Sequence, residues 1–194
     1  VPHDRETIQE GINAAEPGDT VLVDEGIYYE NLQINKEITL GSYFLLDGEL
    51  SHRDATIIDG SSYDESSGPF GSCVLFLPSD NGDAISTNLT GFTIQNGQGT
   101  RVKEIATDTT YYYMGGGIMI DHCLPEITYN YIRNNGGDLE TRGGGTRRGG
   151  GGGLNNDDDV EFDEDRNGYY STTQLTRDDE IIFSNNIFEN NDSE

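Results

Sequence analysis

A short stretch in the C-terminal half has the residue types and spacing of a calcium-binding loop. Residues 163–168 read D-E-D-R-N-G and match the pattern D-x-[DN]-x-[DN]-G, in which oxygens at positions one, three and five face one ion. The twelfth position is Gln174 instead of the usual glutamate, so a nearby acid would complete the site. The candidate ligands are Asp163, Asp165, Asn167, the carbonyl of Tyr169, Asp178 and Asp179. The stretch predicts bound calcium, and a solvated acidic loop is the alternative.

Paired acids and an exposed cation are the residue types needed for two further chemistries. The acid pairs at 157–158 and 178–179 are of the kind that general acid–base hydrolysis of a glycosidic bond requires. Elimination from an acidic sugar needs a cationic base instead. Arg133 is the best-placed candidate for that role, because it follows Ile132 in a repeat and points outward if Ile132 points inward. The alternative for Arg133 is a solubilising surface residue.

Tyrosines occur in runs, at 28–29, 111–113 and 169–170. Aromatic rings stack on sugar faces, so the run of Tyr111, Tyr112 and Tyr113 is a candidate glycan-binding platform. The alternative is that these rings cover a flank of the fold or line a protein interface, where tyrosine is also favoured. The sequence leaves both interpretations open.

Charge and hydropathy limit the classes of partner. The 194 residues include 36 acidic and 11 basic side chains, which give a formal net charge of −25. Such a charge repels nucleic acid and anionic lipid and attracts cations. No apolar run approaches the ~18 residues of a membrane-spanning helix. We therefore expect a single domain over residues 1–194 that neither binds nucleic acid nor inserts into a membrane.

One helix followed by many short strands is expected. Residues 7–10 read T-I-Q-E, a capping box, and Ile8, Ile12 and Ala15 then fall on one helical face. Turn residues at 17–19 end the helix. Beyond them, β-branched and aliphatic runs are separated by turn residues, as is typical of short strands. These runs lie at 20–23, 32–34, 38–40, 55–58, 73–77 and 89–94.

A repeat recurs in three segments, at 89–96, 127–135 and 182–191. The last two share I-x-x-N-x-I and a terminal Asn pair, which aligns Ile127 with Ile182. Glycine triplets also precede an apolar residue twice, at Ile118 and Leu154. In stacked turns ~4.8 Å apart, inward aliphatic residues would form one continuous core, and a recurring asparagine would form a ladder of amide hydrogen bonds.

These features resemble the secreted right-handed parallel β-helix proteins, the broad group that includes pectate lyases and polygalacturonases. Residues 7–31 resemble the capping helix and first turn of that group, and 57–60, 91–97 and 115–118 resemble later turns. The resemblance implies an all-β fold, a right-handed parallel β-helix with a short N-terminal capping helix and long loop insertions. The expected insertions span about 98–114, 136–150 and 155–180.

The resemblance implies a secreted or cell-surface protein but does not fix an activity, because the fold carries catalysis, glycan binding and scaffolding alike. The N-T-D, G-H-G and R-I-K signatures of polygalacturonases are absent. We therefore expect a non-catalytic, calcium-associated structural or glycan-binding module. A polysaccharide lyase or glycoside hydrolase acting on acidic polysaccharide is the alternative. The expected partner is a polysaccharide or surface glycan, or further copies of the chain, because a final repeat without a cap leaves an open edge that the next copy could pair with. The alternative explanation of this edge is that the chain is a fragment of a longer protein.

Two cysteines, Cys73 and Cys123, leave the disulfide state open. Cysteines two turns apart in such a stack would lie ~10 Å from each other, which is beyond the reach of a disulfide. A bridge is therefore possible only if the two residues fall on adjacent turns. Two buried free thiols are the alternative.

Overall fold

The computed structural model describes most of the N-terminal two thirds of the chain and several strands beyond it. The described residues are 1–64, 66, 68–103, 111–121, 123–136, 154–157, 161–163, 168–170 and 182–191. Over these residues the protein is predominantly β, with parallel sheets and few helices. Within this part of the chain, no helix has the length and apolar character needed to cross a membrane.

Three parallel sheets and one mixed sheet contain the described strands. Sheet A contains β1 (Thr20–Val23), β4 (Thr39–Ser42), β8 (Asn88–Thr90), β13 (Glu126–Thr128) and β18 (Ile182–Ser184). Sheet B contains β2 (Gly26–Tyr28), β5 (Thr56–Asp59), β9 (Thr93–Gln95), β14 (Tyr131–Arg133) and β19 (Ile187–Glu189). Sheet C contains β3 (Leu32–Ile34), β7 (Val74–Phe76), β12 (Ile118–Asp121) and β15 (Leu154–Asp157). Sheet D contains β6 (Phe70–Gly71), β10 (Gly99–Lys103), β11 (Tyr111–Met114), β16 (Glu161–Asp163) and β17 (Gly168–Tyr170).

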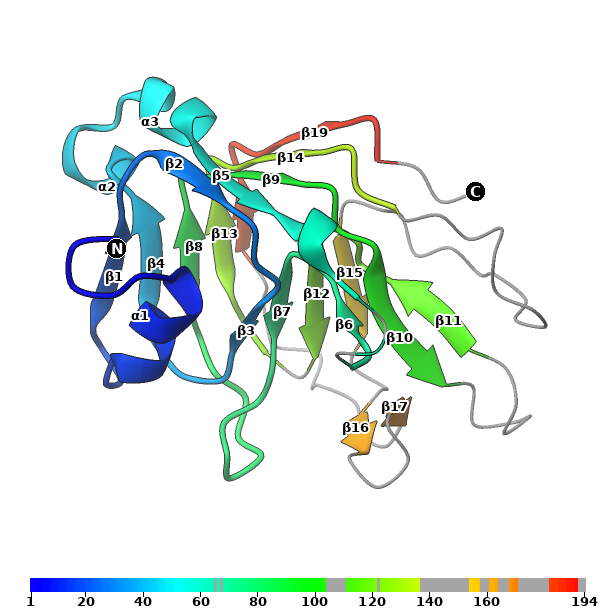
Figure 1. Cartoon of the computed structure of the whole chain (residues 1–194). Helices are drawn as coiled ribbons and strands as arrows, with labels where there is room; N and C mark the ends of the chain where they lie inside the picture. Colours follow the sequence, from blue (N-terminus) through cyan, green and yellow to red (C-terminus); the bar gives the residue numbers. More distant parts are fainter. Residues whose placement is uncertain are drawn as a thin grey trace.

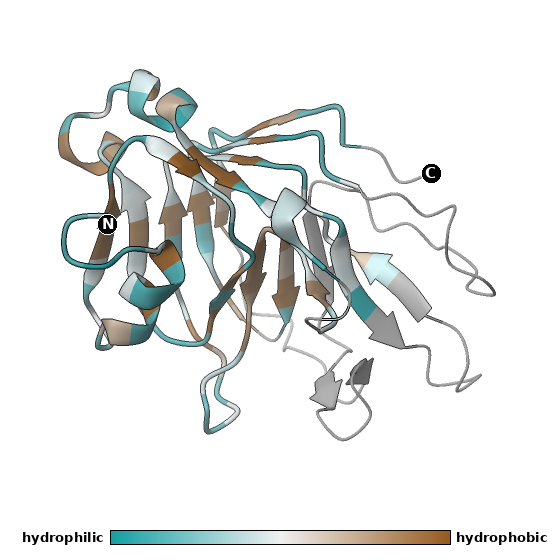
Figure 2. Cartoon of the chain, viewed as in Figure 1, coloured by the Kyte–Doolittle hydropathy of each residue, from teal (hydrophilic) through white to brown (hydrophobic). Residues whose placement is uncertain are grey.

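On each of the first four circuits the chain visits sheets A, B and C in the same order and adds one parallel strand to each, and the last described circuit adds β18 to sheet A and β19 to sheet B (Figure 1). The arrangement is compatible with a parallel β-helix. Hydrophobic positions recur along neighbouring strands of the parallel sheets (Figure 2). In sheet A, Leu40, Leu89 and Ile127 are paired in register, and in sheet B, Ile94 and Ile132 are paired. All five are fully buried, so the expected continuous core is present.

Helix α1 (Ile8–Ala14) begins at the predicted capping box. The amide of Glu10 donates to Thr7 Oγ1 at 3.1 Å, and the Glu30 carboxylate accepts from the amides of Ile8 and Gln9 at 2.9 Å each. These acceptors satisfy first-turn donors that have no partner inside the helix. Ile8 and Ile12 are buried against the first strands, so α1 covers the N-terminal end of the stack (Figure 1).

The last described circuit pairs one residue away from the predicted alignment. Ile127 pairs with Phe183, not with Ile182, and Ile132 pairs with Phe188. The I-x-x-N-x-I match between the second and third repeats is therefore wrong by one position. Strand side chains alternate between two faces, so a shift of one residue exchanges the inward and outward sets. In sheet B, the inward residue is Phe188 and its neighbour Ile187 lies on the outer face.

Asparagine ladders form at two corners of the stack, as predicted. The side-chain amide of Asn130 donates to Asn186 Oδ1 at 3.3 Å, and that of Asn135 donates to Asn191 Oδ1 at 3.0 Å. Each amide also donates to a backbone carbonyl of the circuit before it, which for Asn130 is that of Leu89 at 3.0 Å. The ladders therefore join successive circuits through otherwise unpaired corner groups.

Both cysteines are free and buried. They flank paired strands of sheet C on adjacent circuits, but Cys73 precedes β7 whereas Cys123 follows β12. They consequently lie at opposite ends of these parallel strands, which explains why adjacent circuits do not bring them into contact. Removal from water disfavours the thiolate, and it raises the pKa of each thiol to about 12.

Additional elements lie between the strands of the three parallel sheets. Between β4 and β5 lie two short helices that the sequence does not predict, α2 (Phe44–Asp47) and α3 (Leu50–Ala55), and η1 (Gly60–Ser62) follows β5. Helix α2 packs so closely on β4 that a side chain at position 41 would overlap Leu45, and a glycine occupies this position. Between β9 and β12, strands β10 and β11 form an antiparallel hairpin in sheet D.

Candidate functional site

Arg133 lies on the outer face of sheet B, in the orientation that the repeat predicts. Its neighbour Ile132 is fully buried, whereas Arg133 is partly exposed. Arg133 Nε donates to Gln95 Oε1 at 3.1 Å, and the guanidinium carbon lies 4.9 Å from the centre of the Tyr131 ring. At this distance the cation interacts favourably with the face of the ring. The two contacts hold the guanidinium against the sheet.

A row of polar side chains runs across sheet B through Arg133. Asp59, Gln95, Arg133 and Glu189 occupy the same register position on β5, β9, β14 and β19. Gln95 Nε2 donates to Asp59 Oδ2 at 2.8 Å, and the hydroxyl of Tyr131 donates to Glu189. Since the Gln95 amide donates to Asp59 on one side, its oxygen is available to accept from Arg133 on the other. Asp59, Gln95 and Arg133 are therefore joined by hydrogen bonds of fixed polarity, whereas Glu189 is bonded to Tyr131.

Asp59 anchors this row as a charged acceptor. Its carboxylate is only 4% exposed and accepts from the Ser61 amide at 3.0 Å and from Asn96 Nδ2 at 2.8 Å, besides Gln95. Burial by itself would raise the pKa of Asp59, but the bonds from Ser61, Gln95 and Asn96 outweigh it, so the pKa is lowered. The group is thus ionised at neutral pH and orients the Gln95 amide.

A second arginine reaches the same ring from helix α3. The guanidinium carbon of Arg53 lies 5.8 Å from the centre of the Tyr131 ring, and Arg53 is 8% exposed. Its Nε donates to Asp54 Oδ1 at 2.8 Å, and its carbonyl accepts from Thr93 Oγ1 at 3.0 Å. The bond from Thr93 ties α3 to β9. Two cations from different elements therefore converge on one tyrosine.

The outer face of sheet B is suited to binding more than to proton transfer. It presents an aromatic ring, the Arg133 guanidinium and an oriented carboxamide on adjacent strands, while the Arg53 guanidinium lies beside the ring and is largely buried. Its three carboxylates, those of Asp54, Asp59 and Glu189, each accept a hydrogen bond from a described neighbour. Planar hydrogen-bonding groups beside an aromatic ring match the alternating hydroxyl and C–H faces of a sugar chain. We call Arg53, Asp59, Gln95, Tyr131 and Arg133 the sheet B strip.

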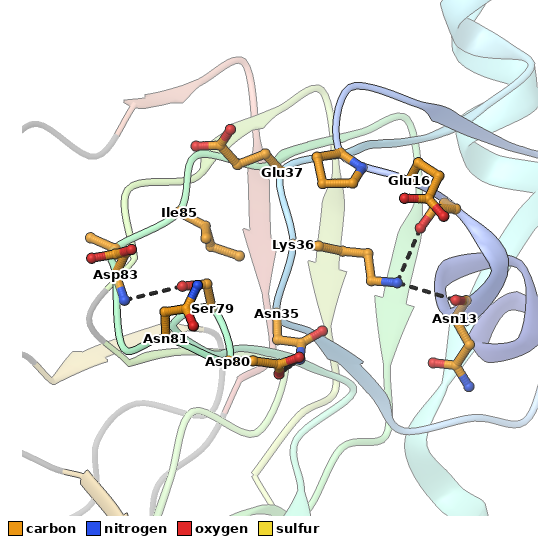
Figure 3. Close-up of a pocket in the computed structure, with 13 residues that line it drawn as sticks. Asn13, Glu16, Asn35, Lys36, Glu37, Ser79, Asp80, Asn81, Asp83 and Ile85 are labelled. Atoms are coloured by element: carbon orange, nitrogen blue, oxygen red, sulfur yellow. Dashed lines mark hydrogen bonds between the residues drawn. The ribbon is translucent and has the colours of Figure 1, made fainter.

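A cleft of about 700 Å³ lies at the other side of the stack, between the end of α1 and the loop 79–85 (Figure 3). Lys36 projects into it, and its ammonium donates to the carbonyls of Asn13 and Ala15, each at 3.1 Å. These are the unpaired carbonyls at the C-terminal end of α1, so Lys36 closes the helix end. Asn35 donates to Asp80 at 2.8 Å. The polar groups of the cleft mainly attach the capping helix, which makes it a weaker candidate than the sheet B strip.

The candidate calcium loop is only partly described. Asp163 ends β16 and pairs with Gly168 of the antiparallel strand β17, which also contains Tyr169. The other candidate ligands, Asp165, Asn167, Asp178 and Asp179, lie outside the described residues. Among the residues that are described, no group of three or more His, Cys, Asp or Glu side chains could hold a metal ion. Calcium binding by the loop stays a prediction.

The three tyrosines of the predicted glycan platform form most of strand β11. Tyr111, Tyr112 and Tyr113 pair with Lys103, Val102 and Arg101 of β10. They belong to sheet D, whereas the sheet B strip belongs to the parallel stack, so the structure does not bring the predicted platform together with Arg133. A glycan platform at β11 stays a prediction.

Sequence reasoning missed most of the sheet B strip. The repeat that aligns 89–96 with 127–134 places Gln95 opposite Arg133 and Thr93 opposite Tyr131, so reading the outward positions of each repeat would have found part of the row. Arg53 gave no such signal, because it belongs to a helix that the sequence did not predict. Its position beside Tyr131 depends on tertiary contacts alone.

Comparison of the chain with protein-family models, with curated proteins and with solved structures finds no match in any of the three. The likeness to pectate lyases and polygalacturonases therefore depends on the sequence motifs together with the parallel sheets. The chemistry of the sheet B strip is the main guide to function.

Proposed function

We propose that the protein is a right-handed parallel β-helix that acts as a secreted or cell-surface glycan-binding module. In this proposal a polysaccharide lies along the outer face of sheet B and is bound without being cleaved. The observation that carries the proposal is the sheet B strip: the Tyr131 ring beside two guanidinium groups, continuous with the oriented amide of Gln95. Strands ~4.8 Å apart present these groups at regular intervals to an extended ligand.

The charge of the molecule favours a neutral glycan over an acidic one. The net charge of −25 repels a polyanion during approach, although salt limits this effect to about 8 Å at physiological ionic strength. At the strip, Arg53 is paired with the carboxylate of Asp54, and Arg133 lies in register with Glu189 on the neighbouring strand. Binding would therefore depend mainly on neutral hydrogen bonds and on stacking against Tyr131.

The alternative function, cleavage of acidic polysaccharide, would also use Arg133. An arginine acting as a base must give up a proton before it can accept one from the sugar. Here Arg133 Nε donates to Gln95 and the guanidinium lies over Tyr131, contacts that favour its charged, donating form. These contacts support the binding proposal more strongly than the catalytic one.

Affinity electrophoresis tests the proposal. Native gels that contain xylan, galactomannan or mixed-linkage β-glucan should retard the wild-type protein, and gels with polygalacturonate or alginate should retard it less. Tyr131→Ala and Arg133→Gln should restore normal mobility in the retarding gel, since each removes a central contact. Tyr29→Ala is the matched control, because Tyr29 is 60% exposed but lies outside the strip. Equal retardation of all variants would contradict the proposed site.

Incubation with polygalacturonate or alginate distinguishes the alternative. The binding proposal expects neither unsaturated uronate products nor new reducing ends, with or without added calcium. Product formation that Arg133→Gln abolishes and Tyr29→Ala preserves would show that the protein is a lyase or hydrolase and would overturn the non-catalytic proposal.

A further inference from the structure

His52 is held between two carboxylates from different parts of the chain. Its Nδ1 lies 2.9 Å from Glu25 Oε1, and its Nε2 lies 3.1 Å from Asp47 Oδ2. Ionised carboxylates only accept hydrogen bonds, and a neutral imidazole can donate from only one nitrogen. Both contacts are therefore favourable only when the ring is the doubly protonated imidazolium. The geometry is that of a charged clasp.

The clasp connects the 44–55 insertion to the parallel stack. His52 belongs to α3 and Asp47 ends α2, whereas Glu25 lies in the turn between β1 and β2. Among the residues that the structure describes, the ring of Tyr43 also packs against His52, in an edge-on contact with 6.0 Å between ring centres. The charged neighbours on α3 itself are Arg53 and Asp54. The side chain of His52 is 21% exposed, so protons can reach it.

The residue after His52 is Arg53, the member of the sheet B strip that the insertion supplies. Arg53 reaches Tyr131, and its carbonyl is fixed by Thr93. A loss of the clasp would free one side of α3 while leaving the bond from Thr93 on the other. The position of Arg53 beside Tyr131 is therefore mechanically linked to the contact between His52 and Glu25.

We propose that His52 is a positioning residue whose protonated ring clasps the 44–55 insertion to the β1–β2 turn and thereby holds Arg53 beside Tyr131. The effect on glycan binding rests on the function proposed above, whereas the clasp itself does not. Deprotonation of the ring removes one of the two hydrogen bonds and its charge, and so loosens α3.

The direction of the pH dependence follows from the environment of the ring. Burial lowers the pKa of His52, but the hydrogen bonds and charges of Asp47 and Glu25 outweigh it, and the pKa is raised above its usual value. A group with a raised pKa contributes its full stabilisation below the pKa of the unfolded chain and loses it as pH rises through the folded value. The clasp is therefore closed in acid and opens as the solution becomes alkaline.

Nuclear magnetic resonance titration tests the clasp without any ligand. Glu25→Gln and Asp47→Asn should each lower the pKa of His52, because each removes one negative neighbour. His3 provides the matched control: it also lies near a carboxylate, 3.4 Å from Asp24, but its side chain is 76% exposed and does not touch the insertion. A His52 pKa that neither variant changes would overturn the proposal.

Amide hydrogen exchange tests the mechanical consequence. Protection factors of residues 44–55 should fall as pH rises through the His52 pKa, by about tenfold for each pH unit by which that pKa exceeds its unfolded value. Protection of α1 should not follow this pH dependence. His52→Gln should abolish the pH dependence at 44–55, His3→Gln should preserve it, and Glu25→Gln should weaken it. Unchanged protection at 44–55 across the titration in the wild-type protein would overturn the proposal.

Binding to the retarding polysaccharide then separates this proposal from the previous one. If the clasp positions Arg53, wild-type retardation should weaken at alkaline pH, whereas Arg53→Gln and His52→Gln should bind weakly at both pH values. If the titration and exchange results hold but no polysaccharide retards the protein, the clasp is supported and the glycan-binding function fails. If binding is pH-independent while Arg53→Gln weakens it, the function is supported and the positioning role of His52 is overturned.

Discussion

The two ends of the parallel stack continue the same inward columns but differ in what covers them. At the N-terminal end, Val21 begins the sheet A column, lies close to α1 and is 7% exposed. At the last described circuit, Phe183 continues that column and is 36% exposed, and Phe188 of sheet B is 50% exposed. Both ends supply large apolar residues in the correct register. A strand cannot bury its inner face alone. The inward residues of a terminal circuit are therefore buried only where another element, such as α1, packs over that end of the stack.

The largest effect should come from one column measured at two positions. Ile94 is fully buried in mid-stack and Phe188 occupies the same sheet B column at the exposed end. Ile94→Ala should lower the free energy of unfolding by about 2–5 kcal/mol. Phe188→Ala should cost about 1–1.5 kcal/mol, half of what full burial of the ring contributes. Urea denaturation of both variants measures the difference, and equal losses would show that the last described circuit is covered as well as the middle of the stack.

Calcium should stabilise the C-terminal end of the stack and leave the N-terminal end unchanged. If the 163–180 stretch binds the ion, saturating calcium should stabilise the folded state by about 2.7 kcal/mol at a hundredfold excess over Kd. Calorimetry and thermal melting in calcium and in chelator measure this gain, and Asp163→Asn should reduce it. Hydrogen exchange should change at β18 and β19 and not at α1. An identical melting temperature in calcium and chelator would contradict the predicted loop.

The asparagine ladder allows a buried and a half-buried position to be compared, with a smaller expected effect. Asn130 is fully buried, donates to the carbonyl of Leu89 and accepts from the amide of Phe92 at 3.0 Å. Asn130→Ala should therefore cost about 1–3 kcal/mol, because it leaves buried backbone groups without partners. Asn186→Ala, on the half-buried next rung, should cost less, since water can reach the groups it leaves. The order of the two urea midpoints checks this, and a reversed order would refute it.

The smallest effect should come from the capping box of α1. Thr7→Ala removes the acceptor of the Glu10 amide and should cost about 1 kcal/mol. The loss should appear as faster exchange of the α1 amides and of β1, the strand that α1 covers. Thr93→Val is a useful contrast, because it removes the bond to Arg53 and should affect the 44–55 insertion instead. Equal effects of either variant on α1 and on the 44–55 insertion would mean that unfolding is fully concerted.

The sequence predicted the parts of the fold that follow from local chemistry and repetition. The capping box located α1, and the alignment of 89–96 with 127–134 placed Leu89 on Ile127 and Ile94 on Ile132. The glycine triplets correctly aligned Ile118 with Leu154. Recurring asparagines predicted the ladder. Each of these signals depends on residues close in sequence or on a repeat that preserves its register.

The parts that were missed depend on tertiary contacts. The slip at Ile182 arose because Ile182 and Phe183 are both apolar, so hydropathy could not distinguish the inward residue. Helices α2 and α3 have four and six residues, too few to form alone, and are fixed by contacts such as that of Leu45 with Gly41. Because Arg53 belongs to α3, its place in the candidate site was equally hidden.

The asparagine ladders also bear on how such a chain can lengthen over evolutionary time. The span from Thr93 to Asn130 forms one circuit that carries an inward column residue, a corner asparagine and a backbone acceptor for the rung above. A tandem duplication of this span would therefore introduce a new turn that already fits the turns on both sides. By contrast, loss of a single residue between Asn130 and Asn135 would disrupt the spacing of both ladders at once. Growth by whole circuits is consequently much easier for this molecule than change by single residues.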